Sequence, residues 1–240
     1  MRAGGLADKG VPHTTIHAVP IQKTERARWR FYALVWFIAH TAVWISGVRL
    51  IPGSRFVPYS DLGIPGTPWI SQFVTPLAIV GVLQMLVLWK AQQVKPVFIE
   101  SGRLGGWRIW VAPVAMLTIT GGAATRGFVE AGWEHYAGLL MTCMLVGMTE
   151  ELTFRGTLVV WLRKAAYSEK TVLVASSALF GLFHLPNILI GGDVREVLVQ
   201  VVATAVLGMS FYALRRASGK LWPCMLLHAV YDAVILSTSI

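Results

Sequence analysis

The chain contains 240 residues, of which 55% are hydrophobic and 14% are charged, and its mean hydropathy is +0.60. This composition is too apolar for one soluble domain of that length and indicates a multi-pass integral membrane protein. The net charge of +9 could suggest a nucleic-acid partner, but the basic residues gather in alternate loops, which is the pattern of membrane topology. We therefore expect a lipid bilayer, and no nucleic acid, among its partners.

Seven apolar runs are long enough to cross the roughly 30 Å hydrocarbon core of a bilayer. In chain order they cover residues 31–50, 69–89, 109–125, 136–158, 171–190, 194–214 and 221–238. The third is the weakest, because Gly121, Gly122 and the following Arg126 shorten it. In the sixth, Thr204 and Gly208 are small and lie one turn apart, so we expect this helix to pack closely against its neighbours. The predicted fold is all-α, a polytopic transmembrane helical bundle of about seven spans, with the functional helices in the C-terminal half.

Three regions follow from this pattern: a basic tail at 1–30, membrane helices with an outside loop at 31–106, and a helical block at 107–240. The tail lacks the short apolar core of a secretory signal, so the first apolar run is expected to be a retained span. Residues 52–68 are rich in Pro and Gly, which indicates the outside loop. With a cytoplasmic N-terminus, sixteen Lys and Arg residues fall on inside segments and four on outside segments, with Arg155 inside the fourth run set aside. We therefore expect a cytoplasmic N-terminus and an outside C-terminus.

Ionisable residues interrupt the apolar runs of the third region. A charged side chain at the bilayer centre costs roughly 2.5 to 3.5 kcal/mol, so such groups have to pair with one another or with a substrate. In the fourth run, Glu151 and Arg155 are four residues apart and can form an ion pair on one helix face, while Glu150 points about 100° away. Glu150 would then be available as a general base. The alternative is that both glutamates mark the cytoplasmic helix end and that Arg155 snorkels to the interface.

Two later runs carry histidines at a similar depth. Pro186 cannot donate a backbone hydrogen bond, so we expect a kink that opens room for water beside His184. His228 and Asp232 are four residues apart, so the carboxylate can orient the imidazole. At 1.5 Å per residue, Glu150, His184, His228 and Asp232 all lie roughly 10 to 18 Å deep, which predicts that they share one layer.

The remaining histidines and the two cysteines have structural interpretations. Cys224 lies one turn before His228 on the same face, which allows an alternative in which its thiol is a nucleophile activated by His228. Buried free cysteine is more commonly a small hydrophobic residue, and Cys143 and Cys224 indicate no disulfide framework. His40 is expected to pack or to form a hydrogen bond within the first run, and His135, in a polar segment, to be solvated.

With these residues, the chain resembles the CPBP family of intramembrane proteases, which includes the CaaX prenyl endopeptidases and the bacterial Abi-type membrane proteins. The EExxxR motif is present as Glu150, Glu151 and Arg155, the FxxxH motif as Phe180 and His184, and the HxxxN or HxxxD motif as His228 and Asp232. These motifs cover about residues 145 to 235, so 107–240 would be a CPBP-like catalytic membrane domain. The N-terminal half depends on hydropathy alone, and we expect the plasma membrane of a prokaryote as the location.

The resemblance implies hydrolysis of a peptide bond near the C-terminus or the membrane segment of a membrane-associated protein or peptide, prenylated or not. Glu150 would activate the attacking water with help from His184, and His228 with position 232 would stabilise the oxyanion. The CaaX branch usually has Asn at that last position, whereas an ionised Asp232 only accepts hydrogen bonds. Our hypothesis is that Asp232 instead orients His228 as the donor.

The sequence also bears on cofactors and on other functions. Glu150, His184, His228 and Asp232 are all possible zinc ligands, but the chain has no HExxH pair, and the family is read as using a glutamate-activated water without zinc. We expect no metal and no other cofactor. A proton-coupled transporter is an alternative, because buried Glu, His and Asp also form proton relays, although no internal repeat typical of transporters is visible. A non-catalytic immunity or scaffold protein is another.

Overall fold

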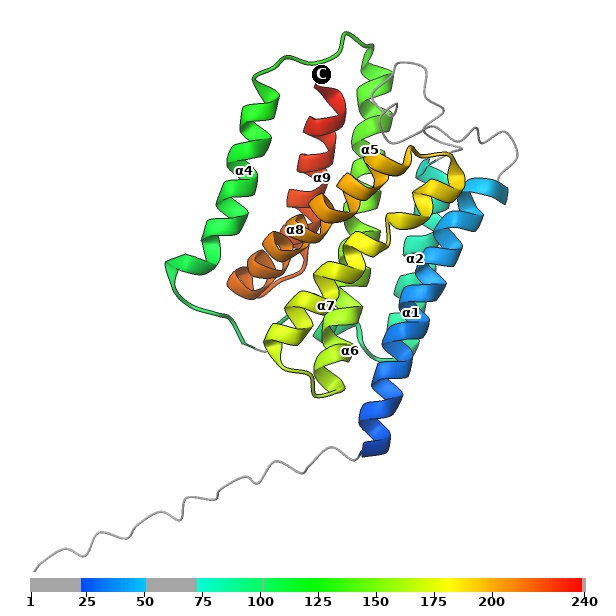
Figure 1. Ribbon diagram of the computed structural model, residues 1–240, viewed down its shortest axis with the longest axis vertical. Coiled ribbons are helices and arrows are strands. Elements are labelled where there is room, and N and C mark those ends of the chain that lie inside the picture. Colours follow the sequence, from blue (N-terminus) through cyan, green and yellow to red (C-terminus); the bar gives the residue numbers. More distant parts are fainter. Residues whose placement is uncertain (1–22, 51–72, 101, 239–240) are drawn as a thin grey trace, which may run out of the picture.

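The computed structural model describes residues 23–50, 73–100 and 102–238, and its regular elements are helices apart from isolated bridges that pair Ile99 with Lys220 and Phe128 with Thr238 (Figure 1). The α-helices are α1 (Lys23–Leu50), α2 (Thr75–Lys90), α3 (Val94–Phe98), α4 (Val111–Ala124), α5 (Trp133–Glu151), α6 (Val159–Lys164), α7 (Glu169–Leu182), α8 (Val194–Ser218) and α9 (Trp222–Ser237). Short 3-10 helices cover Trp107–Trp110 and Leu185–Ile190, and a π-helical segment covers Leu152–Leu158. The prediction of an all-α fold is confirmed for these residues. The loop at 52–68 and residues 1–22 of the basic tail lie outside them.

Each predicted apolar run overlaps a helix. Within the described residues, three helices are long and apolar enough to cross a membrane, namely Trp133–Lys164, Glu169–Leu189 and Val194–Ser218, and α2 and α9 are shorter apolar helices. The outward face of α8 is apolar, with Val199, Val202 and Val206 among its exposed residues. These features are those of an integral membrane protein, while the number of about seven spans stays a prediction.

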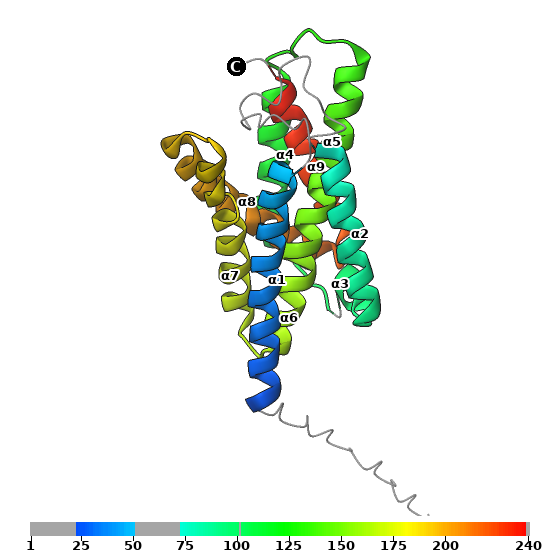
Figure 2. The same cartoon turned by 90° about the vertical axis from the view of Figure 1, so that its right-hand side faces the viewer.

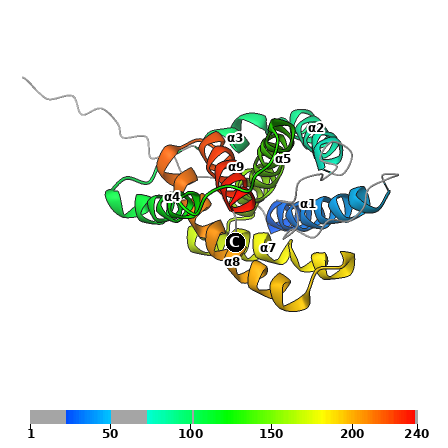
Figure 3. The same cartoon turned by 90° about the horizontal axis from the view of Figure 1, so that it is seen from above.

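Seen along the bundle, the helices form two layers (Figure 3). One layer contains α2, α5, α9 and α4, the other contains α7 and α8, and α1 lies at the side of the bundle against α2, α6 and the π-helical segment. Figure 2 shows α5 and α9 between α7 and α8 on one side and α2 on the other. The rings of Phe154, Phe180, Phe183 and Phe211 contact one another where the layers meet. Helix α5 and its π-helical continuation therefore run through the middle of the protein.

Glycines allow neighbouring helices to approach closely at the level of the candidate site. A Cβ added at Gly147 on α5 would lie 2.6 Å from the Met225 carbonyl oxygen of α9 and 3.1 Å from the Ala229 nitrogen. A Cβ at Gly208 on α8 would lie 3.1 Å from the Ser177 Cα of α7. The close packing predicted for the sixth run is confirmed at Gly208. The first contact brings together α5 and α9, which carry Glu150, His228 and Asp232, and the second packs α8 against α7, which leads into His184.

A Gly147→Ala variant is expected to be less stable than the wild-type protein by about 1 to 3 kcal/mol, because the new methyl group meets backbone atoms of α9 that cannot rotate away. The measurement is the midpoint of thermal or denaturant unfolding in detergent. Gly121→Ala is the matched control, since a Cβ at that position on α4 has no atom of the described residues within 4 Å. It is expected to leave stability unchanged or to raise it by up to about 1 kcal/mol. Equal unfolding midpoints for the two variants would contradict the packing argument.

Glu100 joins the ends of several helices at the opposite end of α5 from Trp133. Its carboxylate is 1% exposed and accepts from Arg163 Nη1 at 2.8 Å, Arg215 Nε at 2.8 Å and Arg216 Nη1 at 3.2 Å. These arginines belong to α6 and to the end of α8, and Glu100 follows α3. A single buried anion thus fixes the segment after α3 to two helices of the C-terminal region.

Candidate active site

The candidate site begins where α5 changes into a π-helix. Glu150 and Glu151 are the last residues of α5, and every residue from Leu152 to Leu158 is buried. In this segment Thr157 Oγ1 donates to the Leu152 carbonyl, five residues earlier, at 3.0 Å. Short π-helical segments are rare in proteins and are frequent at functional sites.

The predicted ion pair between Glu151 and Arg155 is confirmed. Arg155 Nη1 donates to Glu151 Oε1 at 2.9 Å, and both side chains are 0% exposed. The guanidinium also lies over the Phe180 ring at 4.0 Å and over the Phe211 ring at 5.1 Å from the centroids. Arg155 is therefore held inside the protein, and the alternative in which it snorkels to the membrane surface is wrong.

His228 lies among three carboxylates. Its Nδ1 donates to Glu151 Oε1 at 3.0 Å, while its Nε2 is 3.4 Å from Asp232 Oδ2 and 3.9 Å from Glu150 Oε2. The ring stacks on Phe211 with centroids 4.8 Å apart. The predicted contact between His228 and Asp232 is confirmed, but it is made by Nε2. Glu151, which sequence spacing pairs only with Arg155, holds the other ring nitrogen.

His184 follows the end of an α-helix and precedes a 3-10 helix. Helix α7 ends at Leu182, and the 3-10 helix begins at Leu185 with Pro186 in its first turn, so the predicted kink takes the form of a change of helix type. His184 Nδ1 donates to the Phe180 carbonyl at 3.0 Å, and Thr204 Oγ1 is 3.4 Å from the same nitrogen. Because Nδ1 carries the proton in this contact, the Nε2 of a neutral ring can accept a hydrogen bond.

Glu150, His184, His228 and Asp232 line one cavity of about 130 Å³. The prediction that these residues of α5, α9 and the segment after α7 come together is therefore confirmed. Glu150 is buried, and its Oε2 has no hydrogen-bond partner among the described residues. The rest of the lining is mainly apolar and aromatic and comes from α5, α7, α8 and α9, as Val146, Phe180, Gln200, Ala203, Thr204, Leu207, Phe211, Tyr231 and Ile235. Glu151 and Arg155 lie behind the lining and support it.

Sequence patterns did not identify Gln200, Tyr231 or Asn187 as parts of this region. Gln200 and Tyr231 line the cavity, and Asn187 Nδ2 donates to Gln200 Oε1 at 3.1 Å. Polar residues inside an apolar run are the only signal that could have indicated Gln200. Asn187 follows Pro186 in a segment that is typical of a turn, so its place in the sequence did not indicate a functional role.

Other candidate chemistry does not face the cavity. Cys224 is fully buried, its Sγ donates to the Phe211 carbonyl at 3.3 Å, and it is absent from the lining, so the thiol alternative has no geometric support. The part of the chain that the structure describes contains no group of three or more His, Cys, Asp or Glu side chains arranged to hold a metal ion. A metal-independent reaction stays a prediction.

Two other histidines have structural roles. The prediction for His40 is confirmed, since its Nδ1 is 3.0 Å from Gln84 Nε2 and its ring stacks on Phe183 with centroids 5.0 Å apart. The prediction of a solvated His135 is wrong, because this side chain is 7% exposed and contacts the Tyr136 ring. Helix α5 begins at Trp133, so His135 falls in its first turn and on the inward face.

Comparison with known proteins supports the same part of the chain. Residues 132–234 match the family model described as type II CAAX prenyl endopeptidase Rce1-like. Searches of curated proteins and of solved structures found no match. The matched segment begins just before α5 and contains Glu150, His184, His228 and Asp232, which agrees with the resemblance drawn from the three motifs. The match of residues 132–234 supports the interpretation of this part of the chain as a protease domain of the CPBP/CAAX type.

Proposed function

We propose that the protein is an intramembrane endopeptidase in which Glu150 activates a water molecule for peptide-bond hydrolysis. The observation that carries the proposal is the Glu150 carboxylate, which lies in a cavity with one oxygen that has no hydrogen-bond partner in the described chain. A buried carboxylate of this kind is costly to maintain in a membrane helix unless it serves a function. The match of residues 132–234 to a protease family model supports the reaction class.

In the proposed mechanism, water lies between Glu150 and the Nε2 of His184. Glu150 takes a proton from the water as the water oxygen attacks the substrate carbonyl carbon, and His184 Nε2 accepts the second hydrogen bond of the water. The tetrahedral intermediate carries a negative oxygen. Glu150 then gives its proton to the leaving nitrogen as the C–N bond breaks, which restores the carboxylate.

His228 is the proposed donor to the negative oxygen. His228 Nδ1 keeps its proton and donates a hydrogen bond to Glu151, so a second proton on Nε2 makes the ring an imidazolium that can donate toward the cavity. Asp232, 3.4 Å from Nε2, stabilises that positive charge, and Arg155 keeps the Glu151 carboxylate in place. This division of roles gives Glu151 the orientation of His228 that the sequence hypothesis had assigned to Asp232.

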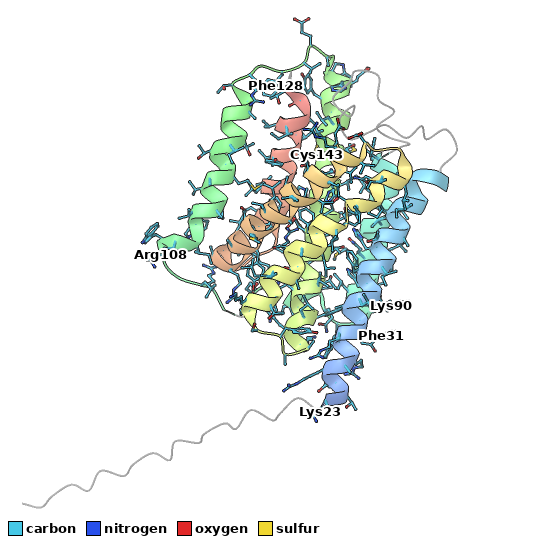
Figure 4. All side chains as sticks on the ribbon, in the orientation of Figure 1. Lys23, Phe31, Lys90, Arg108, Phe128 and Cys143 are labelled. Carbon is cyan, nitrogen blue, oxygen red and sulfur yellow. The ribbon has the colours of Figure 1, made fainter. Side chains whose placement is uncertain are left out.

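We propose that the protein crosses the membrane about seven times with its N-terminus in the cytoplasm, and that 107–240 acts as the catalytic unit. Lys23, Lys90 and Arg108 lie in the lower half of the molecule and Phe128 near the top (Figure 4). Trp89 and Trp107, next to two of these basic residues in the chain, are largely exposed, which is typical of the membrane interface. Contacts of α4 with α8 and α9 support a unit that begins before the matched segment. A prokaryotic plasma membrane stays a prediction.

The proposed substrate is a membrane-associated protein or peptide cleaved near its C-terminus or in its membrane segment. The apolar cavity lining favours a substrate with apolar groups around the scissile bond. The matched family model is described as a CAAX prenyl endopeptidase. The first probes to compare are therefore a peptide that ends in a farnesylated CAAX sequence and the same peptide without the prenyl group.

The test is cleavage of these two peptides by the purified full-length protein in proteoliposomes, followed by mass spectrometry of the products. The wild-type protein is expected to cleave at least one of them, and His184→Ala to lower kcat by about 10²-fold because the water loses its second anchor. A chelator is expected to leave turnover unchanged. Full activity of His184→Ala would contradict the mechanism, and activity that a chelator abolishes and zinc restores would replace it with a metal-dependent one.

A further inference from the structure

The cavity lacks the neutral donor that the resemblance leads one to expect at position 232. The CaaX branch usually carries Asn there, whereas this chain has Asp232, whose ionised carboxylate only accepts hydrogen bonds. Among the residues that line the cavity, Gln200 carries the only carboxamide. Thr204 on α8 also lines the cavity, but its hydroxyl already donates to the main-chain carbonyl of Gln200 at 2.7 Å. Gln200 is therefore a neutral N–H donor that the cavity offers to a bound molecule.

Asn187 fixes which end of the Gln200 amide faces the cavity. Asn187 Nδ2 donates to Gln200 Oε1 at 3.1 Å, so the oxygen is occupied, and Gln200 Nε2 has no hydrogen-bond partner among the described residues. Asn187 is itself tied to the candidate site, since its backbone N–H donates to the His184 carbonyl at 3.0 Å. The short segment that holds His184 thus also orients the Gln200 donor.

The position of Gln200 along α8 indicates which part of a substrate it would reach. Thr204, one turn further along α8, has its hydroxyl 3.4 Å from His184 Nδ1. One helical turn advances about 5.4 Å, and an extended peptide advances about 3.3 Å per residue. A peptide with its scissile carbonyl beside His184 would therefore present another main-chain carbonyl to Gln200 roughly two residues away.

We propose that Gln200 Nε2 donates a hydrogen bond to a main-chain carbonyl of the substrate about two residues from the scissile bond, and that Asn187 is the positioning residue for this donor. The proposal rests on the proposed function, because it requires a peptide in the cavity. It adds a substrate-binding contact that none of the three motifs contains. The site would select an extended peptide backbone whatever the side chain at that position.

The test combines peptides in which one substrate carbonyl is replaced with protein variants in which the Gln200 donor is removed. In the peptide that the wild-type protein cleaves faster, each amide within three residues of the scissile bond is replaced in turn by a thioamide, whose sulfur is a weaker acceptor. The thioamide placed about two residues from the scissile bond is expected to lower kcat/KM by about five- to tenfold in the wild-type protein. Gln200→Met is expected to lower kcat/KM by the same factor, mainly through KM, and to be insensitive to that thioamide.

Two further variants separate a positioning role from a general loss of structure. Asn187→Asp offers only acceptors, so Gln200 would turn its Nε2 toward Asp and present Oε1 to the cavity, and the thioamide is expected to have no effect. Leu198→Met, on the exposed face of α8, is the control and is expected to keep both turnover and thioamide sensitivity.

The outcomes distinguish this proposal from the proposed function. Unchanged thioamide sensitivity in Gln200→Met, together with loss of turnover in Glu150→Gln, would overturn the Gln200 contact alone. If the wild-type protein cleaved neither peptide, the proposed function would be overturned, and this contact with it.

Discussion

A Glu150→Gln variant is expected to fold normally and to lose about 10²- to 10⁴-fold of kcat, because the amide keeps the shape of the side chain but cannot take a proton from water. Normal folding is expected because Glu150 Oε2 has no hydrogen-bond partner among the described residues that the amide nitrogen could disturb. The measurement is kcat for the faster peptide in proteoliposomes, with the unfolding midpoint of the same preparation as the check on structure.

Two control variants test whether the loss of kcat is specific to Glu150. Glu134→Gln makes the same change on the exposed first turn of α5 and is expected to leave kcat unchanged. Asp232→Asn puts the residue usual in the CaaX branch beside His228, and is expected to keep kcat within about tenfold of the wild-type value, since Asp232 stabilises a charge and does not act as the base. Loss of turnover in Asp232→Asn combined with full turnover in Glu150→Gln would assign the base to Asp232.

A Glu151→Gln variant is expected to be destabilised by about 3 to 5 kcal/mol, because it leaves the fully buried Arg155 without its counter-charge. The double variant Glu151→Gln with Arg155→Met is expected to recover most of this loss, since it removes both buried charges together. The measurement is the unfolding midpoint in detergent of the Glu151→Gln variant and of the double variant.

The matched control is Glu25→Gln, which removes a partner of Arg28 from an exposed pair at 3.3 Å. Exposed pairs contribute only about 0 to 1 kcal/mol, so this midpoint is expected to shift little. Activity adds a second readout. The double variant still lacks the carboxylate that holds His228 Nδ1, so it is expected to be stable and to have low turnover. A stable single Glu151→Gln variant would show that the buried pair is not what holds this part of α5.

Hydropathy predicted the positions of the helices well because the thickness of a bilayer sets the length of an apolar run. It did not predict that α1 begins at Lys23, because the first turns of this helix are polar and precede the apolar run. It also did not predict the cluster at Glu100. Glu100 contacts residues far from it in the chain, such as Arg215, and the periodicity of hydrophobic residues within one helix does not indicate such contacts.

The candidate site was predictable where spacing on one helix determines a contact. The pairs Glu151 with Arg155 and His228 with Asp232 follow from residues four apart. The hydrogen bond from His228 to Glu151 was not predictable, because it depends on how closely α5 and α9 approach at Gly147. Gln200 belongs to no motif, and only its contact with Asn187 gives its amide a direction.

The π-helical segment Leu152–Leu158 has a consequence for how this protein tolerates changes in length. A π-helical turn holds one residue more than the α-helix of the same length. Deletion of one residue after Arg155 would therefore let the segment rewind as an α-helix, and Trp161 and all that follows would keep nearly the same orientation relative to the carboxylates before it. The same deletion in the α-helical part of α5 would rotate the following residues by about 100°. Single deletions are therefore expected to be tolerated better in this stretch than earlier in α5, which sequencing of functional variants from a random deletion library can measure.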